Sequence, residues 1–431
     1  MNSGFILRLL NKATKIEANE VKAVLVSFSF IFTILASYYI IRPVRDAMAS
    51  DWTDVELSTI WTLTFLISFL VVSIYGYVCS KVKFKNLVPG VYGFFAATFY
   101  LLYFFTNAFP DLNLINQMFY VWVSVFSLLN ISVFWSFMAD TYKQEQSRRL
   151  FGFIASGSSL GAIFGPAVSF FLAEKVGSNE LILISATMLL VPIFIVLYLQ
   201  KIKETELANT SAAEYNEQAI GSGILAGFKE FALKPILLGI GLFIFIYTGI
   251  STFVYFEIKN ILIDVDPDSR TQIWAGIDLA VNVLAVITGM FGTSRLATKF
   301  GLKVTLPLVP IIIAGLLFLL ALSPILWAVV GLQIIRRAGE YSITKPAREM
   351  LFTLVDRESR FKAKSVIDVV IYRGGDIFWA WSFTGLTQVM GLGLGGIAIV
   401  GGFIATLWSY VALRLGRTFD ESQILDKSPE Q

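Results

Sequence analysis

The chain has 431 residues, of which 56% are hydrophobic and 15% are charged, whereas a soluble domain carries about a quarter charged residues. This composition predicts an integral membrane protein, and the small excess of 34 basic over 31 acidic residues does not predict nucleic-acid binding. The absence of histidine and the single cysteine, Cys79, exclude an internal disulfide and remove the side chains of most metal sites and nucleophilic triads. We therefore expect no enzyme, no cofactor and no metal.

Residues 1–20 contain a short apolar patch followed by charges, which is not the pattern of a cleavable signal. We expect an amphipathic cytoplasmic segment on the membrane surface. After it come about twelve apolar segments, each near the 20 residues that a membrane-spanning helix needs. They begin near Val21, Leu57, Leu87, Gln117, Phe151, Leu181, Pro235, Gln272, Val304, Ile325, Ala363 and Leu392.

This spacing predicts an all-helical membrane protein made of two six-helix halves. The predicted parts are residues 1–20, a first half at 21–200, a cytoplasmic loop at 201–234, a second half at 235–415 and a cytoplasmic tail at 416–431. Alternate connections are rich in Lys and Arg, so the positive-inside rule places both termini in the cytoplasm.

The two halves carry similar basic loops at equivalent positions. Cys79–Lys85 follows the second span and Leu296–Lys303 follows the eighth, while Glu145–Gly152 follows the fourth and Glu358–Lys364 the tenth. Many secondary transporters are built from such repeats. The arrangement resembles the major facilitator superfamily, whose fold would imply transport by alternating access.

The end of the first span carries positive charges on the outer side of the membrane, where the positive-inside rule predicts few of them. Arg42 and Arg45 share a helix face, Asp46 lies one turn after Arg42, and Pro43 is expected to kink the helix. We interpret the two arginines as substrate ligands; interfacial snorkelling with a local ion pair is the alternative.

Two further features lie inside the fifth and eighth predicted spans. In the fifth, Gly157, Gly161 and Gly165 repeat every four residues and predict close approach of a neighbouring helix. In the eighth, Asp278 is a cation site, a proton site, or the partner of an arginine from another helix.

In the seventh span Tyr247, Ser251 and Tyr255 form a stripe that can stack on a flat ligand, although aromatic core packing explains it as well. The tenth and eleventh spans hold the densest charge. Arg336 or Arg337 can pair with Glu340 at helical spacing, which leaves a positive remainder.

Guanidinium groups bind carboxylate and phosphate oxygens well, so the excess of arginine predicts an anionic substrate. Structural ion pairs between helices are the alternative. Arg348, Arg373 and Asp376 belong to the same charged region.

Two stretches are similar to the ATP/ADP antiporter (nucleotide transporter) family. The first is Tyr39–Arg42 with Arg45 and Asp46; the second comprises Tyr341, Ser342, Pro346, Arg348–Met350, Asp356, Glu358, Ser359, Lys362, Lys364 and Ile367–Val370. Tyr120 and Tyr255 stand where the family is expected to carry carboxylates, and Arg373–Asp376 replaces a glycine-lysine-serine-glycine run. The resemblance implies a divergent bacterial member, nucleotide exchange and an inner-membrane location.

We therefore hypothesise a monomeric secondary transporter of an anionic solute, most simply a nucleotide, embedded in the lipid bilayer. The expected substrate ligands are Arg42, Arg45, Arg336, Arg337, Arg373, Tyr247 and Tyr255. The expected charge-pairing or coupling residues are Asp46, Asp278, Glu340, Arg348 and Asp376. Two alternatives stay open: a proton-coupled carrier or exporter of organic anions or drugs, and a polytopic sensor or assembly factor that uses the 201–234 loop.

Overall fold

The computed structural model describes residues 16–79, 81–82, 84–110, 112–207, 224–291, 293–323, 325–356, 363–364 and 366–425. Helices account for nearly all of them, and this described part of the chain contains no strand. The predicted segment 1–20 lies outside it up to residue 15. So do most of the loop predicted at 201–234 and the signature residues Glu358, Ser359 and Lys362.

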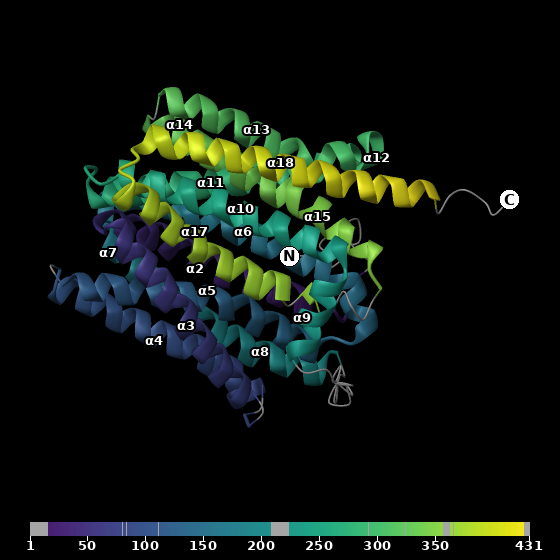
Figure 1. Ribbon diagram of the computed structural model, residues 1–431. Helices are drawn as coiled ribbons and strands as arrows, with labels where there is room; N and C mark the ends of the chain where they lie inside the picture. The colour runs from purple at the N-terminus through teal and green to yellow at the C-terminus, as the bar shows by residue number, and fades with distance from the viewer. Residues whose placement is uncertain are drawn as a thin grey trace. The chain divides into compact units, whose positions relative to one another are not determined.

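The first half contains six predicted spans, and each is helical (Figure 1). They are α2 (Val21–Met48), α3 (Asp54–Cys79), α4 (Phe84–Ala108), α5 (Asn113–Thr141), α6 (Gln144–Val176), and a sixth span divided into α7 (Ser178–Met188) and α8 (Val191–Thr205). A 3-10 turn, Ala49–Asp51, joins the first two. Pro192 stands at the start of α8, where its missing N–H costs no helical hydrogen bond.

The second half repeats this order after the short helix α9 (Ile224–Leu233). Its helices are α10 (Pro235–Ile261), α11 (Pro267–Phe291), α12 (Thr293–Phe300), α13 (Leu302–Leu322), α14 (Leu326–Gly339), α15 (Lys345–Leu351), α17 (Tyr372–Thr384) and α18 (Leu394–Leu425). The helix α18 extends ten residues into the predicted tail, and its Asp420 accepts hydrogen bonds from the first backbone amides of α13.

Ten helical segments among the described residues are long and apolar enough to cross a membrane. The predicted tenth and eleventh spans are helical too, but π-helical turns interrupt them. The turns are Glu340–Thr344 between α14 and α15, Val366–Ile371 before α17 and Gly385–Val389 after it. The prediction of an all-helical membrane fold is confirmed, and both interrupted spans carry several charged residues.

The chain forms two compact units. The first contains Met1–Ala49, Leu63–Glu217 and Val265–Leu279, and the second contains Ser50–Thr62, Gln218–Asp264 and Ala280–Gln431. The units differ from the predicted halves because each unit includes the start of one span from the other half. The start of the second span belongs to the second unit, and the start of the eighth span belongs to the first.

Within the first unit, α2 and α6 pack backbone to backbone. A β-carbon on Gly157 would lie 2.6 Å from the carbonyl oxygen of Phe28, and one on Gly165 would lie 2.5 Å from that of Ala36. A β-carbon on Gly161 would lie at least as close to the carbonyl oxygen of Phe32. The glycine repeat therefore brings two helices together, as its spacing predicts. In the second unit α13 and α18 run side by side along most of their length (Figure 1).

Candidate functional site

In the first unit, four of the predicted charged residues form one ion-pair cluster: Arg42, Arg45, Asp46 and Asp278. A guanidinium nitrogen of Arg42 lies 3.3 Å from Asp278 Oδ1, and its Nε lies 3.6 Å from Asp46 Oδ2. Arg45 donates two hydrogen bonds, of 2.6 and 2.9 Å, to Asp46 Oδ1. Both aspartates are about 1% exposed. Of the interpretations of Asp278, the structure shows the pairing with an arginine of another helix.

Aromatic rings cover the outer faces of the same two arginines. Arg45 lies over the Tyr120 ring at 5.2 Å, and Arg42 lies over the Tyr39 ring at 5.6 Å. Arg45 also donates a long hydrogen bond, 3.4 Å, to Ser124. Two cations and two carboxylates balance each other, and stacking on tyrosine faces stabilises guanidinium groups further. This cluster has no surplus charge in the present conformation.

In the second unit, the central residue is Arg336, near the end of α14. Its guanidinium group donates hydrogen bonds of 3.0 and 2.7 Å to Gln333 Oε1 and one of 3.4 Å to the hydroxyl of Tyr247. The group also lies 5.8 Å from the centre of the Tyr247 ring. Arg336 is only 2% exposed, and the side chains that accept its hydrogen bonds are neutral; the carboxylates of Glu340 and Asp376 act on its charge at longer range.

A buried cation normally has an anion beside it, because desolvating an unpaired charge costs several kcal/mol. Among the described residues, no carboxylate oxygen lies within 4.0 Å of the Arg336 nitrogens. Of the two arginines that could pair with Glu340 at helical spacing, Arg336 therefore does not do so. Glu340 is itself 5% exposed, and its Oε2 is buried without a hydrogen-bond partner. The π turn Glu340–Thr344 begins four residues after Arg336, directly after α14, and such turns are frequent at functional sites.

The remaining predicted residues of this region have separate partners. Arg373 lies 3.8 Å from Asp376, and its side chain is 41% exposed, so the protein does not enclose it fully. Arg348 donates to Glu349 at 2.8 Å instead of to Glu340, and Lys364 binds the other oxygen of Glu349.

Arg337 is 4% exposed and lies over the Tyr341 ring at 6.0 Å. It therefore occupies a different environment from Arg336, although the two residues are neighbours in the sequence.

The two tyrosines of the seventh span lie in different surroundings. Tyr247 contacts Arg336 and has ring neighbours in Tyr372 at 6.2 Å and Trp408 at 5.7 Å. Tyr255 lies eight residues on, about 12 Å along a helix, and its ring packs 5.5 Å from Trp61. The structure thus brings Tyr247 to the arginine and leaves Tyr255 in an aromatic contact.

Three polar residues were not among the predicted site residues, but the structure gives each a specific partner: Gln333, Asp54 and Lys259. Gln333, one turn before Arg336, supplies its principal acceptor. Asp54 and Lys259 form a buried pair at 2.9 Å, from the start of α3 and the end of α10. The only local sign of Gln333 was an amide in an apolar helix, and the partnership of Asp54 and Lys259 spans 205 residues.

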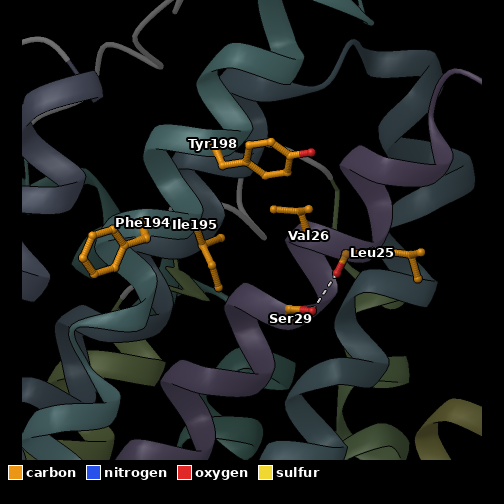
Figure 2. Close-up of a pocket in the computed structure, with 6 residues that line it drawn as sticks. All are labelled: Leu25, Val26, Ser29, Phe194, Ile195 and Tyr198. Atoms are coloured by element: carbon orange, nitrogen blue, oxygen red, sulfur yellow. Dashed lines mark hydrogen bonds between the residues drawn. The ribbon is translucent and has the colours of Figure 1, made fainter.

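A groove of about 360 Å³ lies between α2 and α8 and is apolar (Figure 2). Its lining residues are Leu25, Val26, Ser29, Phe194, Ile195 and Tyr198. The hydroxyl of Ser29 donates within its own helix to the carbonyl oxygen of Leu25, as Figure 2 shows. This groove has no charge to offer an anion and contains none of the predicted site residues.

A helical bundle with charged and π-interrupted spans is the architecture of a membrane transporter. The family model of the Major Facilitator Superfamily matches residues 26–347, and the chain belongs to that superfamily. A solved bacterial homologue of the human lysosomal transporter Spinster, in an inward-facing and unoccupied conformation, is similar in fold. The identity is 14%, the TM-score is 0.62, and the match covers 94% of this chain and 99% of that one. No curated protein matches the sequence.

The protein is therefore a multi-pass integral membrane protein with the fold of secondary transporters that work by alternating access. The comparisons extend to the superfamily and not to the ATP/ADP antiporters within it.

Proposed function

We propose that this protein transports a small organic anion across the bacterial inner membrane, with both termini in the cytoplasm, and that Arg336 binds the anionic group. One observation carries the proposal: Arg336 is 2% exposed and is held by Gln333 and Tyr247, and no carboxylate oxygen in the described part of the chain lies within 4.0 Å of its nitrogens. Neutral partners orient the guanidinium group without cancelling its charge. A substrate carboxylate or phosphate would supply the missing anion through bidentate hydrogen bonds.

The nearby groups fit an anion that carries a ring. Tyr247 places its ring beside Arg336, and the Tyr372 ring lies 6.2 Å from that of Tyr247; base rings stack on aromatic faces with about 1–3 kcal/mol per base. Arg373 follows Tyr372 directly and is partly exposed, so it can add a second positive group. A nucleotide satisfies both features, which agrees with the resemblance of the tenth and eleventh spans to nucleotide transporters. Nucleotides are thus the first substrate class to test.

The test is thermal unfolding of the purified protein with ATP, ADP, a sugar phosphate and a dicarboxylate. A ligand at a hundred times its Kd stabilises a protein by about 2.7 kcal/mol, which is easily measured. We expect a shift with ATP or ADP that disappears in Arg336→Gln. The matched control is Arg414→Gln, since Arg414 is exposed and binds only Tyr410 within its own helix.

The panel separates the parts of the proposal. A shift with the sugar phosphate or dicarboxylate alone, lost in Arg336→Gln, would keep the anion site and remove nucleotides as the substrate. An equal shift in the wild type and in Arg336→Gln would remove Arg336 from the site. Uptake of the identified anion into proteoliposomes, abolished in Arg336→Gln while the variant inserts normally, would establish transport.

A further inference from the structure

Glu257 is a buried carboxyl group for which the described part of the chain supplies no partner. It lies in the last turn of α10 and is 1% exposed, and neither of its side-chain oxygens has a hydrogen-bond donor. It forms no ion pair among the described residues. Glu257 is not among the residues predicted from the sequence to belong to the site.

The nearest cation along the helix is already paired. Lys259 donates to Asp54 Oδ1 at 2.9 Å and to the carbonyl oxygen of Trp52 at 2.8 Å. Residues two apart on a helix point in different directions, so Lys259 does not face Glu257. Asp54 receives further hydrogen bonds from Asn260 at 3.1 Å and from Thr387 at 2.8 Å.

The elements packed against α10 carry other charges, and none of those charges reaches Glu257. They are Asp54 and Glu56 of α3, Lys229 of α9, Arg336 and Arg337 of α14, Asp368 of the π turn before α17, Arg373 and Asp376 of α17, and Arg414, Arg417, Asp420 and Glu421 of α18. Arg336 contacts α10 at Tyr247, ten residues and about 15 Å before Glu257. Among the described residues, Glu257 therefore has neither an ion-pair partner nor a hydrogen-bond donor.

An ionised carboxylate in such a place costs several kcal/mol, which no partner here repays. A neutral carboxylic acid costs far less, because only its polarity and not a charge is buried. The present conformation therefore favours Glu257 with a proton bound. A conformation that admits water or a cation to the end of α10 favours the ionised form. A group whose two protonation states prefer different conformations links proton binding to conformational change.

We propose that Glu257 is the proton-binding site that couples proton movement to the conformational cycle of this transporter. The carboxylate takes up a proton as the chain enters the present conformation and releases it when the Asp54–Lys259 pair separates and the end of α10 opens. This inference rests on the proposed transport function, but it does not depend on which anion is carried.

The test uses cysteine accessibility and needs no substrate. In a Cys79→Ser background, Ser50→Cys places a thiol on the buried 3-10 turn four residues before Asp54, where Ser50 is 1% exposed. Maleimide labelling of the protein in liposomes is measured across a range of pH. At each pH it is divided by labelling of the same thiol in the Glu257→Gln protein, which cancels the titration of the thiol itself.

We expect the labelling ratio to rise with pH, by up to about tenfold for each pH unit above the point where Glu257 loses its proton. Glu257→Gln imitates the protonated side chain and should hold the closed conformation at every pH. Glu145→Gln is the matched control, because Glu145 is an exposed carboxylate, and that variant should behave as the wild type.

A ratio that stays constant with pH would overturn the proposal. A second measurement covers the case in which Glu257→Gln does not fold. Glu257→Asp keeps a titratable group. Its labelling, divided at each pH by that of a small free thiol to remove the titration of the thiol itself, should still rise with pH, and a ratio independent of pH in that variant would overturn the proposal. Failure here with a normal ATP or ADP shift would leave the anion site standing, whereas the reverse result would remove the anion site alone.

Discussion

Lys259 and Asp54 form a buried ion pair, 2.9 Å long, between residues that are 205 positions apart in the chain. Their side chains are 2% and 5% exposed, and the surrounding polar groups satisfy the remaining hydrogen bonds of the carboxylate. Asp54 begins the second span and Lys259 stands near the end of the seventh. Together they attach the start of α3 to the second unit.

Removing one member of this pair should destabilise the protein. Asp54→Asn leaves Lys259 buried without its anion, and breaking a buried pair costs about 3–5 kcal/mol. Thermal unfolding of the detergent-solubilised protein measures the loss. The double variant Asp54→Asn with Lys259→Met removes both charges and should recover part of the stability. A double variant no more stable than Asp54→Asn alone would show that the ion pair is not what holds the two helices.

Gln333 should determine how well Arg336 binds an anion. Gln333→Leu removes the acceptor of two guanidinium hydrogen bonds, so Arg336 loses its fixed orientation. We expect the affinity for the anion found in the ligand panel to fall about tenfold, which corresponds to about 1.4 kcal/mol. Titration of the thermal shift measures it. The exposed Gln388 supplies the control, Gln388→Leu, and equal affinities in the two variants would contradict the positioning role.

Gly161 should not tolerate even a methyl group. A β-carbon there would meet the carbonyl oxygen of Phe32, and it would lie 3.0 Å from the amide nitrogen of Ala36 and 3.1 Å from the β-carbon of Leu35. Gly161→Ala therefore forces α2 and α6 apart, and overpacking of this kind costs about 1–3 kcal/mol. Gly152→Ala in the same helix is the control, because nothing lies within 4 Å of its β-carbon. A melting temperature unchanged in both variants would exclude backbone contact between the helices.

Glu20 should contribute stability that depends on pH. Burial opposes its ionisation, but hydrogen bonds from Arg149, the amide of Glu17 and Gln146 outweigh that cost and lower the pKa of Glu20 below its usual value. Because the folded pKa is the lower one, the contribution is complete above the unfolded pKa, about 4.3, and is lost as pH falls through the folded pKa.

Glu20→Gln tests this contribution. At neutral pH the variant should be less stable than the wild type by about 1–3 kcal/mol, since Arg149 loses a charged acceptor. The difference should shrink below pH of about 4, where wild-type Glu20 becomes protonated. A difference that stays the same from neutral to acid pH would show that the carboxylate charge has no part in it.

Several features of the fold followed from the sequence because they depend on residues close together in the chain. Span lengths and order follow from runs of apolar residues that a bilayer requires to be helical. The contact between α2 and α6 followed from glycines four apart, which lie on one face of any helix. The sequence also shows directly that the tenth and eleventh spans contain arginines, which predicts that these spans bind or pair charged groups.

The partners of those charges were decided by the tertiary structure. Arg336 has Gln333 three residues before it and Glu340 four residues after it, both at helical spacing. Side chains on a helix lean toward its N-terminus, and the guanidinium group accordingly binds Gln333 and, from another helix, Tyr247. The pairs of Arg42 with Asp278 and of Lys259 with Asp54 each join distant segments, so no local spacing predicts them. The lack of a partner for Glu257 among the described residues also depends on the tertiary structure, because a nearby cation such as Lys259 pairs with a residue of another helix.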